Sequence, residues 1–407
     1  MVINKIVRSG LCIGCGLCQS VFEKERCEMK LFSNGFYYPV ISNIDLKDYQ
    51  IKKICPGIKE VGDSKQGLWG HIAFIAEAWS SDRRLRYKAA SGGVASSLAI
   101  SLLENKHVDA VLQTGVRSGQ SFFNELKIST TREDILSNAQ SRYAPVLTLS
   151  NLKQILDKDK ICYAFIGKPC DIVGIKNFMK AYPQYSGRIK FTISIFCGGM
   201  PSYVATKELL ANAVEKNMPK SIKYRGEGWP GCFSATWDDG SVYEESYSES
   251  WGKILSRKVG FRCKICPDGI GMLADIALGD AWNTKNGYPD FNEDDGRNFC
   301  MVRTEVGEKV FNEAFHKGYI VKKVIDESKI RDMQPYQYSR RLWAPWRIIA
   351  ANILSKGIIN FKGLGLLYAF FKSDKQKGLQ EMHGTIVRMM KSKRKLADIS
   401  AINDEDL

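Results

Sequence analysis

The first cysteines of the chain form its strongest local motif. Cys12, Cys15 and Cys18 are each separated by two residues, in the run CIGCGLC. This spacing wraps a tight loop on which three thiols converge on one metal centre. Gly14 and Gly16 permit unusual backbone angles and let amide groups approach the sulfurs. The run matches three quarters of the bacterial ferredoxin pattern C-x2-C-x2-C-x3-C-P and predicts an iron–sulfur cluster.

The fourth ligand of this centre departs from the ferredoxin pattern. Phe22 occupies the position of the fourth ferredoxin cysteine. Cys55, followed by Pro56, supplies a Cys-Pro pair further along the chain, and Cys27 is a nearer rival. Zinc is the alternative metal, but zinc modules usually carry a second C-x2-C pair about 15–20 residues away. No such pair follows at that distance, so the pattern favours iron and sulfide.

A second C-x2-C pair lies far along the chain, at Cys263 and Cys266, and is followed by Pro267. Alone, this pair suits zinc, a redox dithiol or a cluster equally. Cys170 in IGKPCD and Cys197 in FCGG stand where predicted strands end. Free cysteines are commonly buried as small hydrophobic residues, but these two lie in polar, glycine-rich turns. The four thiols together would complete a second set of ligands.

Two glycine-containing turns are candidates for binding an anion. The turn Ser91-Gly92-Gly93 opens a predicted helix directly after a basic stretch, residues 83–88. Amide groups at a helix N-terminus bind phosphate readily, although such a turn also serves as a plain helix cap. Gly167 and Lys168 end a predicted buried strand. In open α/β sheets this carboxyl end of the strands is where ligands usually bind.

The elements that must position these residues alternate between apolar strands and amphipathic helices. Continuous apolar runs predict strands buried in a sheet with helices on both faces. They are expected at residues 71–79, 108–116, 160–167 and 188–197, with a helix at 94–104. Residues 221–300 are expected to form loops and short strands. The prediction is an α/β (mixed α+β) fold, in which a mixed-sheet core follows an N-terminal ferredoxin-like cluster module.

The predicted domain boundaries follow from changes in this pattern. Residues 1–62 are expected to form the cysteine-rich module, with little helix, and residues 63–70 a polar linker. The core is expected to comprise residues 71–150 and 151–335, the second part holding the second thiol set. A basic helical tail is expected at residues 336–407.

Composition restricts the class of protein. Twelve cysteines in 407 residues are far below the roughly 8–10% of a disulfide-built scaffold. The first residues lack the apolar stretch of a secretion signal. We therefore expect a cytoplasmic protein with reduced thiols. No apolar run reaches the roughly 18 residues of a spanning helix, so we expect at most a peripheral contact with the inner face of the membrane.

The net charge of +15 is concentrated in the tail. Between Arg341 and Leu396, twelve Lys and Arg face two acidic residues, a local excess of +10. No nucleic-acid motif accompanies this charge, and we expect no nucleic-acid partner. The stretch 346–372 mixes apolar clusters with spaced cations, and MMKSKRK follows it. Such a segment either lies weakly in a membrane interface or packs on the core or a partner subunit.

Several segments in order resemble the coenzyme F420 hydrogenase/dehydrogenase beta-subunit family. They run from residue 12 to about 282, roughly two thirds of the chain, and are CIGCGLC with GFYYP, CPG, ASGGVAS, AQSRYAP, IGKPCDIVG, FCGG, RGEGWPG and FRCKICPDGIGMLADIALGDAW. The resemblance implies a flavin-binding α/β core, usually with FAD, and 4Fe-4S clusters. Cys232 and the tail beyond residue 335 lie outside it.

The resemblance also implies the residues that hold these groups. The first cluster would use Cys12, Cys15, Cys18 and Cys55, and the second Cys170, Cys197, Cys263 and Cys266. The flavin would lie near Ser91, Gly92, Gly93, Ser141, Arg142, Tyr143, Gly167 and Lys168. Lys168 and Arg142 are interpreted as partners of the flavin, and Asp275 and Asp280 as structural residues. No residue is assigned as catalytic.

The function implied is electron transfer by an iron–sulfur flavoprotein. Clusters exchange single electrons, a deazaflavin exchanges a hydride, and a flavin does both. The redox partner would be reduced coenzyme F420 or ferredoxin, and the acceptor an organic substrate or a partner subunit. The family also includes bacterial proteins found near surface-polysaccharide functions. The rival hypotheses are a non-catalytic electron-transfer subunit and a zinc-stabilised binding module with a basic arm.

Overall fold

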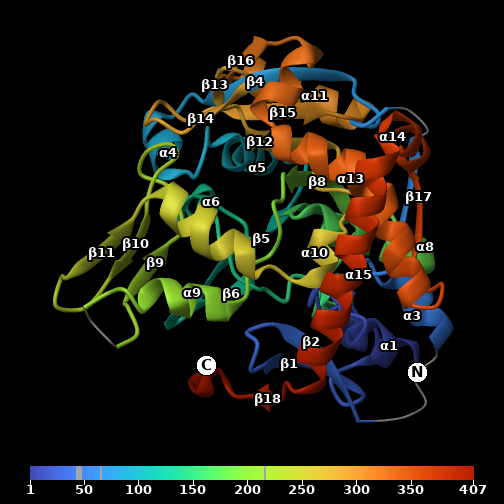
Figure 1. The fold of residues 1–407 in the computed structure, drawn as a ribbon. Helices are drawn as coiled ribbons and strands as arrows, with labels where there is room; N and C mark the ends of the chain where they lie inside the picture. Colours follow the sequence, from blue (N-terminus) through green and yellow to red (C-terminus); the bar gives the residue numbers. More distant parts are fainter. Residues whose placement is uncertain (43–47, 65–66, 215–216) are drawn as a thin grey trace.

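An eight-stranded mixed sheet forms the centre of the protein (Figure 1). The computed structural model describes residues 1–42, 48–64, 67–214 and 217–407. The strands of the sheet, in spatial order, are β16 (Ile320–Val324), β4 (Phe74–Ser80), β15 (Asn298–Val302), β12 (Ile276–Asp280), β8 (Ile189–Ile195), β7 (Tyr163–Gly167), β5 (Ala110–Arg117) and β6 (Gln120–Ser129). The four strands from β12 to β5 pair in parallel, and the other neighbours pair antiparallel. Two reversals make β4 parallel to this group, so the carboxyl ends of all five meet at one edge.

Both faces of the sheet are buried, as the continuous apolar runs predict. Val111 and Ala164 face one core cluster, together with α5 (Val94–Glu104) and α11 (Glu305–His316). Leu112 and Phe165, their neighbours along the strands, face another, together with α7 (Leu152–Lys158) and α8 (Pro169–Ala181). The alternation of side chains along each strand therefore supplies a core on either side.

The N-terminal module contains more helix than expected. It comprises α1 (Val2–Arg8), α2 (Leu17–Phe22), β1 (Cys27–Phe32), β2 (Tyr37–Ile41), α3 (Asp48–Ile54) and β3 (Lys59–Ser64). The helices are too short to show a clear period in the sequence, which explains the missed prediction. β3 also covers the start of the predicted linker, whose residues 65–66 lie outside the described part of the chain.

The C-terminal segment is helical and basic, and it returns to the N-terminal module. Its elements are α13 (Pro335–Leu354), β17 (Asn360–Leu364), α14 (Leu366–Lys372), α15 (Lys375–Ala397) and β18 (Ala401–Ile402). β17 pairs with β3 and β18 pairs with β1. Ile348 and Met389 join Ile3 and Ile6 in one buried cluster. Figure 1 shows α15 passing from the top of the molecule to the N-terminal module.

The segment from residue 201 to 333 contains smaller elements around the central strands. They are α9 (Tyr203–Leu210), β9 (Ser221–Lys223), β10 (Phe233–Thr236), β11 (Val242–Glu245), α10 (Phe261–Lys264), β13 (Asn283–Lys285), β14 (Tyr288–Asp290) and α12 (Ile330–Met333). Two short helices, α4 (Arg83–Lys88) and α6 (Arg132–Ser137), complete the core. The expectation of loops and short strands at 221–300 agrees with β12 and β15, which have five residues each. It does not foresee that these two strands lie in the middle of the central sheet. In the described residues no helix is long and apolar enough to cross a membrane.

Candidate functional site

The first four thiols line one cavity. Cys12 and Cys15 lie on the loop between α1 and α2, Cys18 lies in the first turn of α2, and Cys55 directly follows α3. The rest of the lining is predominantly apolar, including Ile3, Ile6, Met29, Ile51, Ile54 and Pro56. The structure therefore brings together the four residues predicted for the first cluster. Burial, together with the neighbouring thiols of Cys18 and Cys55, raises the pKa of Cys12.

Two glycines shape the loop that carries these thiols. Gly14 and Gly16 have φ angles of 68° and 82°, a region that disfavours side chains, as the sequence predicts. A Cβ atom on Gly16 would approach the Cβ of Ser150 to 2.6 Å. The loop therefore needs glycine at residue 16 both for its backbone angle and for its close packing on the core.

Cys27 takes a different position from Cys55. Cys27 is fully buried at the start of β1, whereas Cys55 lines the cavity with the other three thiols. Cys27 nevertheless contacts Cys18, and this contact, with burial, raises the pKa of the Cys18 thiol. Burial raises the pKa of Cys55 to about 11. The arrangement favours Cys55 as the fourth thiol of the first set, with Cys27 as a buried neighbour behind that set.

The second four thiols also gather, at the edge where the parallel strands end. Cys170 begins α8 directly after β7, and Cys197 follows β8. Cys263 lies in α10 and Cys266 just beyond it. Burial and the Cys263 thiol raise the pKa of Cys197 to about 12. Burial is also the main cause of the raised pKa of Cys170, to which the thiols of Cys197 and Cys266 contribute.

A buried arginine between the two thiol sets was not anticipated from the sequence. Arg262, directly before Cys263, donates from Nε to the carbonyl of Gly57 at 2.8 Å and from its Nη2 to that of Pro56 at 3.3 Å. Those two carbonyls directly follow Cys55. One guanidinium, 2% exposed, therefore holds together the loops that carry both sets. A single arginine in FRCKICP gives no sequence signal for this role.

Further buried charges surround Arg262. Its guanidinium lies 3.5 Å from the carboxylate of Glu60, which is 1% exposed. Burial and nearby Asp268 raise the pKa of Glu60 to about 8. Arg341, also buried, donates to the carbonyls of Leu68 and Leu364 at 2.6 Å each and to that of Pro267. The second thiol set is thus surrounded by ionisable groups, whereas apolar side chains surround the first.

The chemistry of the two thiol sets suits either of two metal centres. Cysteine sulfur ligates both iron–sulfur clusters and zinc. The four sulfurs of the first set line one cavity. Among the described residues, no three His, Cys, Asp or Glu side chains are placed to hold a single metal ion.

The turns predicted to bind the flavin lie along the same edge of the sheet. Ser91–Gly93 follows α4 near the end of β4, and Gly167–Lys168 ends β7. Four strand spacings of about 4.8 Å separate β4 from β7, roughly 19 Å. The Ser91 hydroxyl donates to the carbonyl of Arg297 at 2.9 Å, and the Val94 amide at the start of α5 donates to Asn298 Oδ1 at 3.1 Å. The turn is therefore already held by the protein's own acceptors.

Lys168 and Arg142 also have partners within the protein. Lys168 forms an ion pair with Asp171, with 2.5 Å between Nζ and Oδ2. Arg142 is buried and donates to Asn124 Oδ1 at 2.6 Å, to the carbonyl of Ile222 at 2.5 Å and to that of Ser121 at 2.8 Å. A contact between residue 142 and a flavin would therefore have to come from its backbone. Its neighbours Ser141 and Tyr143 are half-buried.

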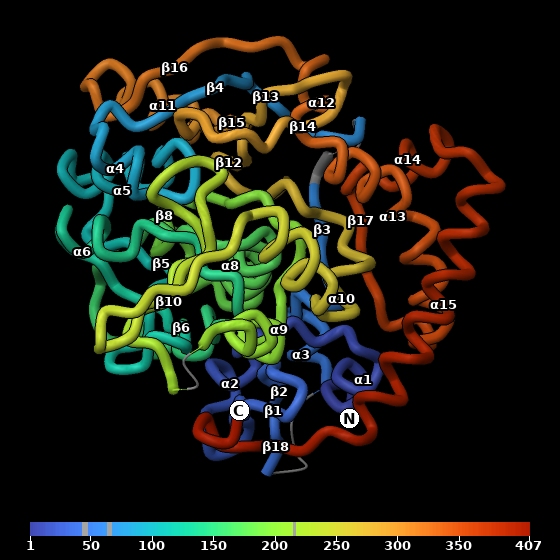
Figure 2. Tube along the Cα trace, turned by 60° about the vertical axis from the view of Figure 1, so that its left-hand side comes forward, coloured from blue at the N-terminus to red at the C-terminus, as the bar shows by residue number. Residues whose placement is uncertain are grey.

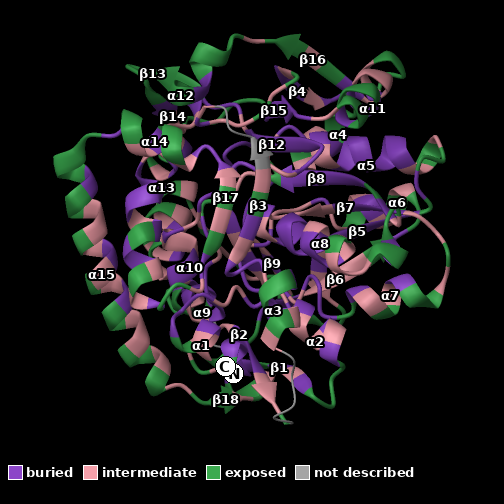
Figure 3. Ribbon diagram, turned by 90° about the vertical axis from the view of Figure 1, so that its right-hand side faces the viewer, coloured by how far each residue is buried: buried purple, intermediate pink, exposed green. Residues whose placement is uncertain are grey.

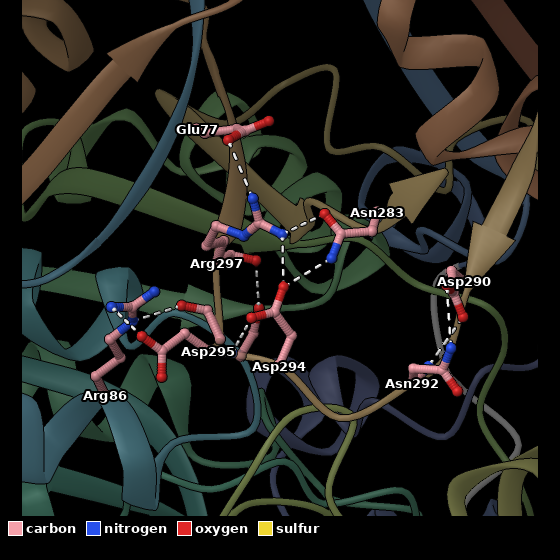
Figure 4. A network of polar contacts seen from close by, with 10 residues as sticks. Glu77, Arg86, Asn283, Asp290, Asn292, Asp294, Asp295 and Arg297 are labelled. Carbon is pink, nitrogen blue, oxygen red and sulfur yellow. Dashed lines mark hydrogen bonds and ion pairs between the residues drawn. The ribbon is translucent and has the colours of Figure 1, made fainter. Parts of the chain in front are cut away.

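Acidic residues neutralise the cations beside the Ser91–Gly93 turn (Figure 4). Arg86 pairs with Asp295 at 3.2 Å and donates to the Gly296 carbonyl at 2.7 Å. Arg297 pairs with Asp294 at 3.2 Å and lies 3.7 Å from Glu77. A phosphate bound at this turn would compete with these carboxylates for the two guanidiniums.

Aromatic side chains cover the end of β12, which sequence reasoning treated as structural. Trp229 and Trp282 stack with centroids 4.5 Å apart. Asp280 accepts hydrogen bonds from Arg225 at 3.1 Å and from Trp229 Nε1 at 3.0 Å. Asp275 accepts from the Thr192 amide at 2.8 Å, in the predicted structural role. The RGEGWPG and GDAW segments therefore meet at the sheet edge, between the two predicted flavin-binding turns.

Two protein-family models match the chain over residues 75–153 and 162–328. Both are described as "Coenzyme F420 hydrogenase/dehydrogenase, beta subunit", the first as its N-terminal part and the second as its C-terminal part. The coenzyme F420 hydrogenase subunit beta of Methanosarcina barkeri is 25% identical over 267 residues, 64% of this chain and 84% of that protein. The coenzyme F420-dependent sulfite reductase of Methanocaldococcus jannaschii is 25% identical over 340 residues, 76% of this chain and 47% of that protein.

A solved structure shares the fold. A chain of the F420-reducing [NiFe] hydrogenase complex from Methanosarcina barkeri superposes with a TM-score of 0.54 and 22% identity. The match covers 69% of this chain and 93% of that one. The mixed α/β architecture is thus confirmed by a known structure, while residues beyond 328 lie outside both family models.

Proposed function

We propose that this chain is an iron–sulfur flavoprotein oxidoreductase. The premise is that the chain belongs to the coenzyme F420 hydrogenase/dehydrogenase beta-subunit family. The protein moves electrons between a bound FAD and two 4Fe-4S clusters. One observation carries the proposal: eight cysteines from five separate segments gather into two sets of four. Free thiols that were buried by chance would not form two sets of four so close to one another.

The residues that would hold the clusters follow from the two sets. Cys12, Cys15, Cys18 and Cys55 would ligate the first, and Cys170, Cys197, Cys263 and Cys266 the second. When bound, such clusters supply one-electron exchange at low potential. Burial contributes to a raised pKa at seven of these thiols, so binding of iron there must release protons: Cys12, Cys15, Cys18, Cys55, Cys170, Cys197 and Cys266. The protein also excludes water from the first set through the apolar lining of its cavity.

The flavin would lie along the sheet edge between Ser91–Gly93 and Lys168, with Ser141, Arg142 and Tyr143 beside it. Support comes from the placement of these segments at the carboxyl ends of parallel strands. Asp171 orients the Lys168 ammonium at this edge. Arg86 and Arg297 are two further cations within reach of a phosphate there, once released from their carboxylates.

The redox partner is proposed to be reduced coenzyme F420 or ferredoxin, and the acceptor an organic substrate, in keeping with a role in a surface-polysaccharide pathway. The relatives support F420, because one is a coenzyme F420 hydrogenase subunit beta and another is a coenzyme F420-dependent sulfite reductase. Cytoplasmic localisation is part of the same proposal, because reduced thiols persist there.

Anaerobic reconstitution with iron, sulfide and FAD tests the proposal. Roughly eight irons per chain are expected for two clusters of four, with FAD released on denaturation. Oxidation of reduced coenzyme F420 by the loaded protein, followed through its absorbance, then tests the donor. One zinc per chain without iron would contradict the proposal and favour the zinc-stabilised module. Failure to take up FAD or FMN would remove the flavin from it.

A second candidate is a non-catalytic subunit that relays electrons to a partner. The relatives named as subunits of F420 hydrogenase favour it. Turnover by the isolated, fully loaded chain separates the two. A catalytic protein should reduce an artificial electron acceptor with reduced F420 by itself, whereas a relay should need its partner subunit.

A further inference from the structure

The helices α14 and α15 form one outer edge of the molecule, and α15 runs along it (Figures 2 and 3). Two large apolar side chains of α14 face solvent there. Leu367 is 77% exposed and Phe371 is 76% exposed. They are four residues apart, so they lie on the same side of the helix. Exposed side chains of this size gathered on one edge mark a contact surface.

The outward side of α15 continues this surface. Leu379, Val387 and Met390 are all exposed, and their spacings of eight and eleven residues place them on one side of the helix. Lys375 connects the two helices, because its Nζ lies 5.7 Å from the centroid of the Phe371 ring. Lys375 is also four residues before Leu379, on the same side. We call Leu367, Phe371, Leu379, Val387 and Met390 the apolar edge.

Cations flank the apolar edge at both ends. Exposed Lys and Arg side chains lie at Lys372, Lys375, Lys377, Lys391, Arg394 and Lys395. The acidic side chains of the same segment are engaged elsewhere. Glu381 pairs with Arg347 at 2.9 Å, and Asp374 caps α15 by accepting from the Lys377 amide at 2.7 Å. Among the ion pairs found in the described part of the chain, none includes Lys372, Lys375 or Lys377, so the edge presents apolar groups between positive charges.

This arrangement differs from the amphipathic segment expected from the sequence. Residues 346–372 do not form one helix, and Trp346 is 7% exposed, stacked on Phe370 at 4.7 Å. Most of the apolar content of that stretch packs inside the protein, as one of the two sequence interpretations expects. The outward sides of α14 and α15 carry most of the exposed apolar side chains of the C-terminal segment, beside Ile349 and Ile353 of α13.

The lysines around the apolar edge indicate whether this surface binds a protein partner or a membrane. Protein–protein interfaces are depleted of lysine, in particular at their centre. Helices that lie in a membrane interface carry Lys and Arg around a row of Leu and Phe. The apolar edge has this second pattern. It also lies beyond residue 328, outside both family models, so it is an addition to the shared fold of the family.

We propose that α14 and α15 dock this protein on an anionic membrane surface. Leu367 and Phe371 enter the headgroup region, while the Lys372 and Lys375 ammonium groups contact lipid phosphates. The two ammonium groups lie beside aromatic side chains of α14: Lys372 Nζ donates to the Tyr368 hydroxyl at 3.1 Å, and Lys375 Nζ lies 4.5 Å from the Phe370 centroid. These cations are therefore held next to the apolar side chains that would enter the headgroup region, and their long stems let the charged ends turn toward lipid phosphates.

Co-sedimentation of the full chain with vesicles tests the proposal. The probes are vesicles of phosphatidylglycerol and phosphatidylcholine in equal parts, and of phosphatidylcholine alone. Leu367→Asp with Phe371→Asp should lower the partition constant for the anionic vesicles more than about tenfold. Each change of Lys372 or Lys375 to Gln should lower it about fivefold. The matched control is Val324→Asp with Val242→Asp, which changes two exposed valines, 73% and 58%, on β16 and β11.

The expected result is binding to anionic vesicles at low salt by the unaltered chain and the control, and loss by the edge variants. The proposal is overturned if the unaltered chain stays in the supernatant, or if the control loses binding to the same extent. It is also overturned if light scattering shows a dimer that the Leu367 and Phe371 changes abolish. In that case the edge contacts a second copy of the chain.

Discussion

The two thiol sets have opposite surroundings. The first lines a cavity whose other walls are predominantly apolar side chains. The second lies among buried charges, with Lys168 and Asp171 on one side and Arg262, Glu60 and Asp268 on another. A negative charge added to an apolar site is poorly compensated, whereas nearby guanidiniums stabilise it. We therefore predict that a cluster held by the second set would be the better electron acceptor, because Arg262 and Arg340 lie beside its Cys266 thiol.

The largest expected effect separates the ligands of the first set from their neighbour. Cys55→Ser should remove one of two clusters and leave roughly four of eight irons per chain. Cys27→Ser is the matched control and should keep both clusters, because Cys27 lies behind the set. Iron analysis with electron paramagnetic resonance measures both. The reverse outcome would exchange the roles of the two cysteines.

A second prediction concerns the residue that joins the two regions. Arg262→Met removes a buried cation from Glu60 and from the carbonyls of Pro56 and Gly57. Above the Glu60 pKa of about 8 this leaves a buried carboxylate without its cation, which costs about 3–5 kcal/mol, and urea unfolding at that pH should detect the loss. The control is exposed Arg257→Met, with a change below about 0.5 kcal/mol. Equal stability of the two variants would mean that Arg262 does not hold the loops together.

A third prediction uses the raised pKa of Glu60. Its carboxyl titrates at about 8 in the folded protein, against an ordinary value of 4.5. Between these values the folded state keeps a proton that the unfolded state has lost. The contribution of Glu60 to the free energy of unfolding is therefore complete below pH 4.5. It declines as the pH rises to about 8, by at most about 1.4 kcal/mol per pH unit.

Glu60→Gln should remove this contribution. The urea midpoint of the variant should fall less between those pH values than that of the unaltered chain. Other titrating groups affect both proteins alike, so the difference between the two slopes isolates Glu60. Identical slopes would show that Glu60 is already ionised across the range, paired with Arg262.

The sequence predicts the thiol motifs well and their surroundings poorly. Continuous apolar runs locate β4, β5, β7 and β8, and the Ser91–Gly93 turn locates the start of α5. The central position of β12 and β15 was not foreseen, because glycine, tryptophan and acidic residues surround the short apolar runs there. Arg262, Glu60 and Arg341 were also missed, since burial of a charge depends on segments up to 273 residues apart. Such long-range contacts leave no local pattern.

The smallest expected effect tests the comparison between the surroundings of the two thiol sets. Arg340 donates directly to the backbone of the second thiol set, to the carbonyl of Cys197 at 2.9 Å and to that of Gly198. It should therefore raise the reduction potential of the second site. Arg340→Gln should lower that reduction potential, where about 60 mV corresponds to a factor of ten in the equilibrium constant for one-electron reduction. The potential of the first site should not change, because the Arg340 guanidinium lies beside the Cys197 and Cys266 thiols of the second set. A redox titration followed by electron paramagnetic resonance resolves the two signals, with Arg257→Gln as the exposed control. Equal shifts at both sites, or a higher potential at the first, would show that solvent and hydrogen bonds to sulfur outweigh the buried charges.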